Sequence, residues 1–281
     1  MLLHPHTATA LDRFAEHPGH AVLITGPEGS GKGTVANWLA TKLLGIAEDS
    51  LANHPYTLWL TEQPITIENV RAAQKLMQLK VPGTATVRRI VIAEQAQTMS
   101  IEAQNAFLKL LEEPPKDTVI ILTASDVQRL LPTIRSRVQQ VNVLPPSSVA
   151  VIQNFAGEHS KEAVEKAYYL SEGHMGLLTA ILRDDSSHPL VEQITQAKTA
   201  LGGSTYERLC LVETIVKNKQ VPVFLKALER ICHAALVQSS LKNTPQTPAW
   251  KSRLSAVVHA EELQQRNASV KLILTDLFLS L

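Results

Sequence analysis

The residues best suited to chemistry form a glycine-rich loop near the amino terminus, Gly26-Pro27-Glu28-Gly29-Ser30-Gly31-Lys32. The loop follows a short apolar run and precedes an amphipathic stretch, which is the context of a phosphate-binding loop. Glycines let backbone amides turn toward one anion, the following helix adds partial positive charge, and the lysine adds a full one. The alternative is a strand-to-helix turn without a ligand. The predicted site for ATP or ADP consists of Gly26, Pro27, Gly29, Ser30, Gly31, Lys32, Gly33 and Thr34.

The residue after the lysine departs from the usual pattern of such loops. Gly33 stands where a Ser or Thr hydroxyl normally binds Mg²⁺, and Thr34 follows one place later. The resulting Gly-Lys-Gly-Thr sequence is similar to the phosphate loop of adenylate kinases. Phosphate binding is therefore expected, while direct binding of Mg²⁺ by a loop hydroxyl is in question.

A second candidate site follows the apolar run at residues 89–93. Glu94 can contact a metal ion, and Gln95 stands next to it. In phosphate-loop ATPases this strand ends in Asp, and a following Glu can serve as base for the attacking water. An amide such as Gln95 only orients a water, and loss of a general base typically costs about 10²–10⁴ in rate. The simpler interpretation is that Glu94 ends a strand at the surface.

These residues need a scaffold, and the first half of the chain predicts one of α/β class. Nearly continuous apolar runs indicate strands that are buried on both faces. Apolar residues at helical spacing lie between them, so the pattern predicts a parallel sheet covered by helices. The predicted strands are 21–25, 56–60, 89–93, 119–123 and 139–143, and the predicted helices are 34–44, 67–79 and 101–112.

The pattern changes at Leu144-Pro145-Pro146-Ser147-Ser148, and helical spacing dominates after it. A second boundary is expected near Asp184-Asp185-Ser186-Ser187. We therefore predict an α/β domain at 1–144, a small helical domain at 145–187 and an all-helical domain at 188–281. The last segment, 270–281, is too apolar for an isolated solvated helix, so it must pack in its own domain or against another subunit.

Composition excludes several classes of protein. The chain has 281 residues, 44% hydrophobic and 19% charged, with a net charge of +1, which excludes a disordered chain and gives no sign of a polyanion-binding surface. The two cysteines, Cys210 and Cys232, lack the spacing of a zinc site, and a reducing cytoplasm is expected. Because no basic leader precedes an apolar core and no apolar run approaches membrane-spanning length, we expect a protein that is neither exported nor membrane-spanning.

The stretch from Glu102 to Val138 carries a specific resemblance. It contains the sequence AQNAFLKLLEEPPKDTVIILTASDVQRLLPTIRSR, which is similar to the NALLKTLEEPP and LLPTIxSRC motifs of bacterial DNA polymerase III clamp-loader subunits. These are AAA+ proteins with a phosphate-loop domain, a helical lid domain and a helical collar domain. The resemblance covers about residues 20–145. Within this family, the sequence is most similar to subunits of delta-prime type.

The resemblance implies roles for further residues. Thr123 or Ser125 lies at the position of the first sensor, which reaches toward the γ-phosphate, although either could be a strand-end cap. Arg137 lies at the position of an arginine that reaches a neighbouring subunit's ATP, a task suited to its planar donors and permanent charge. Gly176 stands near the position of a second-sensor arginine, and His174 is expected at the surface. For Lys109, Glu112 and Glu113 we expect salt bridges along one helix.

Three hypotheses follow. The first is a delta-prime-like clamp-loader subunit that braces the complex, hydrolyses ATP poorly and supplies Arg137 to a neighbour. Its implied partners are gamma/tau and delta subunits, with the sliding clamp and primed DNA reached through the complex. The second is an active gamma-like ATPase motor. The third, a nucleotide kinase, leaves the motifs between Glu102 and Arg137 unexplained.

Overall fold

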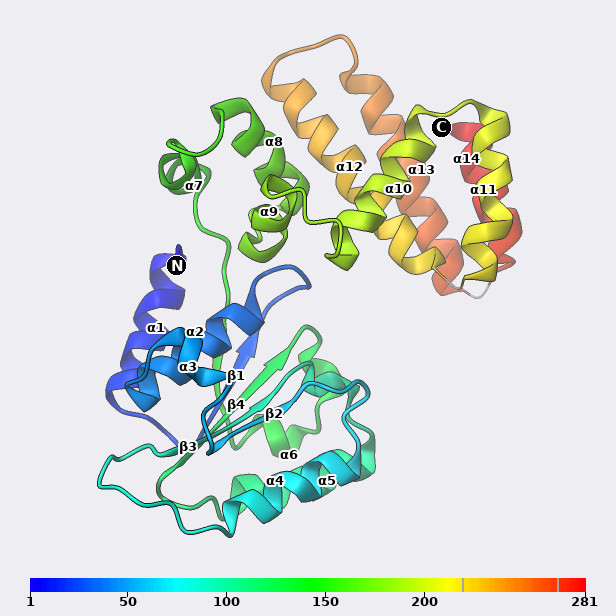
Figure 1. Cartoon of the computed structure of the whole chain (residues 1–281). Coiled ribbons are helices and arrows are strands. Elements are labelled where there is room, and N and C mark those ends of the chain that lie inside the picture. The colour runs from blue at the N-terminus through cyan, green and yellow to red at the C-terminus, as the bar shows by residue number, and fades with distance from the viewer. Residues whose placement is uncertain (219, 267) are drawn as a thin grey trace. The chain divides into compact units, whose positions relative to one another are not determined.

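A computed structural model describes residues 1–218, 220–266 and 268–281 of the protein. These residues form two compact units, Met1–Pro146 and Ser147–Leu281. The first unit contains a sheet with helices on its faces, and the second is helical (Figure 1).

A parallel sheet of five strands in the order β2-β3-β4-β1-β5 forms the centre of the first unit. The register places Thr25 at the end of β1 beside Ala124 of β4 and Asn142 of β5. Because all strands run in one direction, their carboxyl ends meet at the same edge, where the glycine-rich loop begins. The predicted α/β class is confirmed. The strands are β1 (Ala21–Thr25), β2 (Thr57–Leu60), β3 (Arg89–Ala93), β4 (Thr118–Ala124) and β5 (Gln139–Asn142).

Helices cover both faces of this sheet. Val22 and Ile24 of β1 share a core with α1, α2 and α3, whereas Ala21 and Leu23 share a core with α4, α5 and α6. This alternation explains why the strands are apolar throughout. The helices are α1 (Pro5–Glu16), α2 (Lys32–Leu44), α3 (Glu48–Leu51), α4 (Ile67–Met77), α5 (Ile101–Glu112) and α6 (Pro132–Arg135), with 3₁₀ turns η1 (Ala96–Thr98) and η2 (Val127–Arg129).

A buried ion cluster lies at the amino-terminal edge of the sheet, where β3 and β4 begin. Arg89 donates through Nη2 to both carboxylate oxygens of Asp117, at 2.9 and 3.2 Å. Arg88 forms an ion pair with the same carboxylate at 3.1 Å. Arg89 also donates through Nη1 to the carbonyls of Leu76 and Met77, so it satisfies acceptors at the end of α4. This cluster fastens a helix and two strands together.

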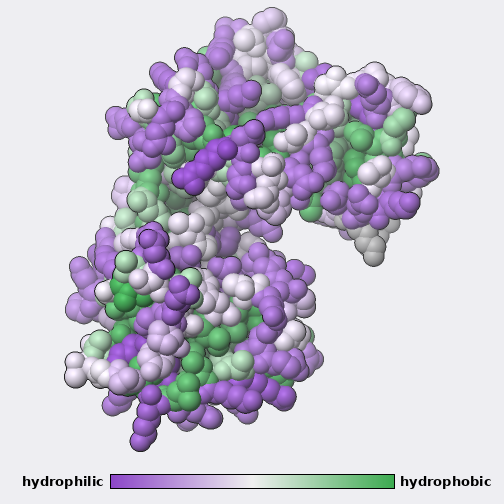
Figure 2. Space-filling view, viewed as in Figure 1, coloured by the Kyte–Doolittle hydropathy of each residue, from purple (hydrophilic) through white to green (hydrophobic). Residues whose placement is uncertain are grey.

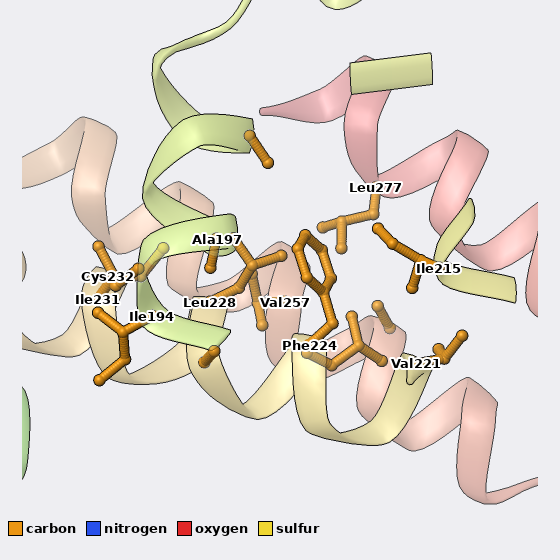
Figure 3. Close-up of a cluster of buried hydrophobic side chains, with 14 of the residues drawn as sticks. Ile194, Ala197, Ile215, Val221, Phe224, Leu228, Ile231, Cys232, Val257 and Leu277 are labelled. Atoms are coloured by element: carbon orange, nitrogen blue, oxygen red, sulfur yellow. The ribbon is translucent and has the colours of Figure 1, made fainter. Parts of the chain in front are cut away.

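The second unit consists of helices around one apolar core. Phe224 on α12 meets Phe278 on α14 edge to face, with ring centroids 5.9 Å apart. Leu228 and Cys232, further along α12, lie in the same core as Val257 of α13 (Figure 3). The helices are α7 (Ser148–Phe155), α8 (Lys161–Ser171), α9 (Met175–Leu182), α10 (Pro189–Gly202), α11 (Thr205–Lys217), α12 (Val221–Leu241), α13 (Thr247–Gln265) and α14 (Val270–Ser280).

The last helix, α14, packs into the core of its own unit through Ile273, Leu274, Leu277 and Phe278. Burial within the unit thus accounts for much of its apolar character, although Leu272 and Leu279 are exposed. The core extends from Leu170 to Phe278, on both sides of residue 187. The division into domains at 1–144, 145–187 and 188–281 stays a prediction.

Among the described helices, none combines the length and the apolar character needed to cross a bilayer. Hydrophilic residues dominate the face seen in Figure 2, and apolar residues gather there in smaller patches.

Candidate functional site

The glycine-rich loop connects the end of β1 to the start of α2 at the carboxyl edge of the sheet. Gly26 has a φ of 154°, and a Cβ there would lie 2.9 Å from Ser30 Oγ, so a side chain would collide with the loop itself. Gly31, with φ 86° and ψ 23°, is the N-cap of α2. No side chain caps this helix start, so its first amides stay available to an anion.

Lys32 is buried in this loop, with 9% of its surface exposed. Its Nζ donates to the carbonyls of Gly26 and Pro27, at 2.7 and 2.8 Å. Burial lowers the pKa of this ammonium, and the charge of Glu28 opposes the shift. Ser30 Oγ is buried without a hydrogen-bond partner among the described residues. Lys32 thus forms no ion pair with a carboxylate in the described ranges, and a buried cation of this kind beside an unsatisfied hydroxyl fits a phosphate group.

Glu94 lies beside the position that lacks the usual hydroxyl. A Cβ on Gly33 would lie 3.4 Å from Glu94 Oε1, while Thr34 is exposed one place further along α2. Burial raises the pKa of the Glu94 carboxyl. This carboxylate has no hydrogen bond or ion pair with the described part of the chain. It therefore fits Mg²⁺, with one protein ligand fewer than a loop that carries a hydroxyl.

Gln95 is held by its backbone and exposes its side chain. It adopts a left-handed conformation, with φ 51° and ψ 50°, at the turn after β3. Its amide donates to Thr123 Oγ1 at 3.0 Å, and Thr123 is buried. One of the two first-sensor candidates therefore fastens the ends of β3 and β4 to each other.

Ser125, the other sensor candidate, lines a pocket beside the loop. Its hydroxyl accepts from Gln97 Nε2 at 2.9 Å, and its amide donates to Gln97 Oε1 at 3.3 Å. No local sequence signal marks Gln97, because only the fold brings it beside a residue 28 positions away. The residues around the pocket are Thr25, Gly26, Pro27, Ser125, Val127, Gln140 and Asn142.

Arg137 is not among the residues around the glycine-rich loop and its pocket; it lies just after α6. Its Nη1 donates to the carbonyl of Thr133 at 3.1 Å, and its Nη2 forms an ion pair with Glu112 Oε1 at 3.1 Å. The salt bridge expected for Glu112 thus joins the end of α5 to the segment after α6 instead of linking one-turn neighbours. Lys109 and Glu113 form no ion pair with any described residue, so our expectation for these two is wrong.

The position of the second sensor lies in the other unit. Gly176 is in the first turn of α9, after the N-cap residue His174. His174 has only 9% of its surface exposed, so the expectation that it lies at the surface is wrong. In the described residues, no group of three His, Cys, Asp or Glu side chains could hold a metal ion. The expectation that the protein has no zinc site stays a prediction.

Comparisons with known proteins agree with the motifs. A family model described as DNA polymerase III, delta subunit, matches residues 9–147. The DNA polymerase III subunit delta-prime of Pseudomonas aeruginosa is 35% identical over 57% of this chain and 54% of its own length. That of Bacillus subtilis is 31% identical over 47% of this chain and 44% of its own length. The matches thus span about half the length of these curated relatives.

A solved structure supports the fold over nearly the whole chain. The DNA polymerase III gamma subunit-related protein of Thermotoga maritima superposes with a TM-score of 0.57 at 22% identity. The superposition covers 98% of this chain and 97% of that one, which shows that the two chains share a fold. With the sheet order and the motifs, these matches show that residues 9–147 of the chain belong to the DNA polymerase III delta-prime subunit family.

Proposed function

We propose that this protein works as the delta-prime subunit of a clamp-loader complex in DNA replication. It braces the complex, binds a nucleotide without turning it over, and supplies Arg137 to a neighbouring ATPase subunit. Its partners are gamma/tau and delta subunits, and it acts on the sliding clamp and primed DNA through the complex. Membership of the family supports this role.

The nucleotide site of this proposal is the loop at residues 26–34. The uncapped start of α2 and the buried ammonium of Lys32 supply positive charge for the phosphates of ATP or ADP. Glu94 would hold Mg²⁺, which supplies charge that offsets the negative phosphates. Ser30 Oγ gains a partner when an anion enters the loop, because this buried hydroxyl otherwise stays unsatisfied.

The proposed lack of ATP hydrolysis rests mainly on Gln95, which stands at the position of the catalytic base. Its side chain reaches solvent at the end of β3, where a carboxylate would be needed to take a proton from water. The amide has no basic form, so it can orient a water without activating it. Gly33, without a hydroxyl, and Gly176, without a charge, weaken two further parts of an ATPase.

Arg137 supports the bracing role, because an arginine useful to a neighbour must be reachable from outside. Its side chain is 37% exposed. A guanidinium clamps phosphate oxygens with planar donors and keeps its charge at every relevant pH.

One observation favours the alternative of an active gamma-like motor. Glu94 is beside the loop, and its raised pKa makes it a better base than an ordinary carboxylate. On this alternative, Glu94 would activate the water that Gln95 orients.

ATP hydrolysis by the purified protein separates the two proposals. We expect no turnover approaching about 1 per second, the lower end of ordinary enzyme rates. Gln95→Glu should restore little activity in the isolated chain, because the loop hydroxyl and the second-sensor arginine are still missing. Ordinary turnover by the wild type, lost in Glu94→Gln, would instead establish the motor.

A further inference from the structure

The contact between Glu112 and Arg137 joins the ends of two helices. Glu112 is the last residue of α5, and Arg137 follows α6 by two positions. Both helices are fixed by one core, in which Leu111 and Ile134 are buried. The two charged side chains therefore extend from backbones that cannot move apart easily.

The guanidinium of Arg137 is held from two sides. Glu112 Oε1 lies 3.1 Å from Nη2, and Nη1 donates to the carbonyl of Thr133 at 3.1 Å. Nη1 also lies 3.5 Å from Ser136 Oγ. Nε has no hydrogen-bond partner in the part of the chain that the structure describes. Two groups thus limit the rotation of a long side chain and still leave it a free donor.

The neighbouring charged residues show that this pairing is selective. Glu113 has the same charge, is exposed, and has no partner among the described residues. Arg135 donates to Gln128 Oε1 at 3.2 Å and does not compete for Glu112. The chain therefore contains a paired carboxylate and an unpaired one at adjacent positions.

We infer that Glu112 is a positioning residue for Arg137: it orients the guanidinium toward the neighbouring subunit before ATP is bound there. This inference rests on the proposed role of Arg137. With side chains 37% and 49% exposed, the pair adds little to folding stability, so its main effect is on orientation. A guanidinium that is already oriented loses less conformational freedom when it meets the phosphates.

The test uses the complete complex, assembled with wild-type protein, Glu112→Gln, Glu113→Gln, Arg137→Ala, or the double variant Glu112→Gln/Arg137→Ala. The measurement is ATP hydrolysis with primed DNA over a range of ATP concentrations. The part of kcat that Arg137→Ala removes defines the Arg137-dependent activity. Glu112→Gln should lose most of that part with little change in KM, because the arginine acts on charge that develops in the transition state.

The controls separate positioning from general damage. Glu113→Gln should match wild type, and the double variant should match Arg137→Ala, because two residues that act as one unit are not additive. A further loss in the double variant, or full activity in Glu112→Gln, would show that Glu112 does not act through Arg137. Higher activity in Glu112→Gln would mean that the carboxylate competes with phosphate, which also overturns the inference. If Arg137→Ala itself has no effect on ATP hydrolysis, the proposed role of Arg137 is wrong, and so is the inference that rests on it.

Discussion

Buried charged residues lie at both edges of the central sheet, but in the described part of the chain only those at one edge have partners of opposite charge. At the amino-terminal edge, the carboxylate of Asp117 faces the guanidinium groups of Arg88 and Arg89. At the carboxyl edge, Lys32 has only carbonyl partners, and Glu94 has no partner within the described residues. Removing charge from water costs free energy unless a counter-charge offsets it. The first edge therefore stabilises the fold, and the second keeps charge available for a ligand.

The largest expected effect is at the amino-terminal edge. Asp117→Asn keeps the size of the side chain but leaves two guanidinium groups without their counter-charge. Breaking a buried pair in this way typically costs about 3–5 kcal/mol. We expect a loss of this size in the free energy of unfolding, measured by urea denaturation.

The control for this variant is Asp12→Asn. Asp12 pairs with Lys42 at the surface, where both side chains are about half exposed. The free energy of unfolding should fall by less than about 1 kcal/mol. Equal losses in the two variants would contradict the contrast between structural and available charge.

At the carboxyl edge, Lys32→Met should separate stability from binding. Methionine has a similar length and no charge, so relief from burying a charge offsets the loss of two hydrogen bonds to carbonyls, and the free energy of unfolding should change little. Affinity for ADP should fall by about tenfold to a hundredfold, because a hydrogen bond to a charged group is lost. Titration calorimetry measures this change.

Lys42→Met is the matched control on the same helix, since Lys42 contacts Asp12 and the ring of Trp38. Its affinity for ADP should equal that of wild type. If Lys32→Met also bound ADP as tightly as wild type, the loop would not use its lysine for phosphate.

The effect of Glu94 should depend on pH. Burial raises the pKa of its carboxyl, so the folded state holds the proton more tightly than the unfolded chain does. Stability then falls as pH rises through this range. Glu94→Gln should therefore be slightly more stable than wild type at neutral pH, and the two should converge under acidic conditions. A difference in urea midpoint that stays constant with pH would contradict this account.

The strands and the glycine-rich loop were predictable because their signals are local. The predicted strands 21–25 and 89–93 agree with β1 and β3 to the residue, since strands buried on both faces are apolar at every position. The helix α1 was missed, although it has Pro5 at its start and buries Leu11 and Phe14 one turn apart.

Contacts between distant segments could not be predicted from local pattern. Arg89 and Asp117 are 28 positions apart, and neither stands in a motif that indicates a partner. From the sequence, Glu112 could equally have paired with a residue of its own helix. It pairs with Arg137 because α5 and α6 pack against each other. Burial of His174 likewise depends on how the helices of the second unit pack.

Two arginines near Arg137 could serve as controls for the trans-acting role, and their surroundings differ. Arg135 lies close to Arg137 in sequence, but its Nε is buried and its Nη1 binds Gln128, so its removal would disturb the fold. Arg129 is exposed, and its side chain has no partner among the described residues. Arg129→Ala is thus the better comparison.

The most direct test of the proposed function is the DNA-stimulated ATPase of the complex assembled with Arg137→Ala or Arg129→Ala. Trans arginines contribute about a thousandfold or more at a single site in some phosphate-loop systems, but other sites in the complex keep their own. We therefore expect a partial loss of kcat with Arg137→Ala, normal assembly, and no change with Arg129→Ala. Unchanged ATPase with Arg137→Ala, or failure of that variant to fold, would show that Arg137 is only a structural partner of Glu112.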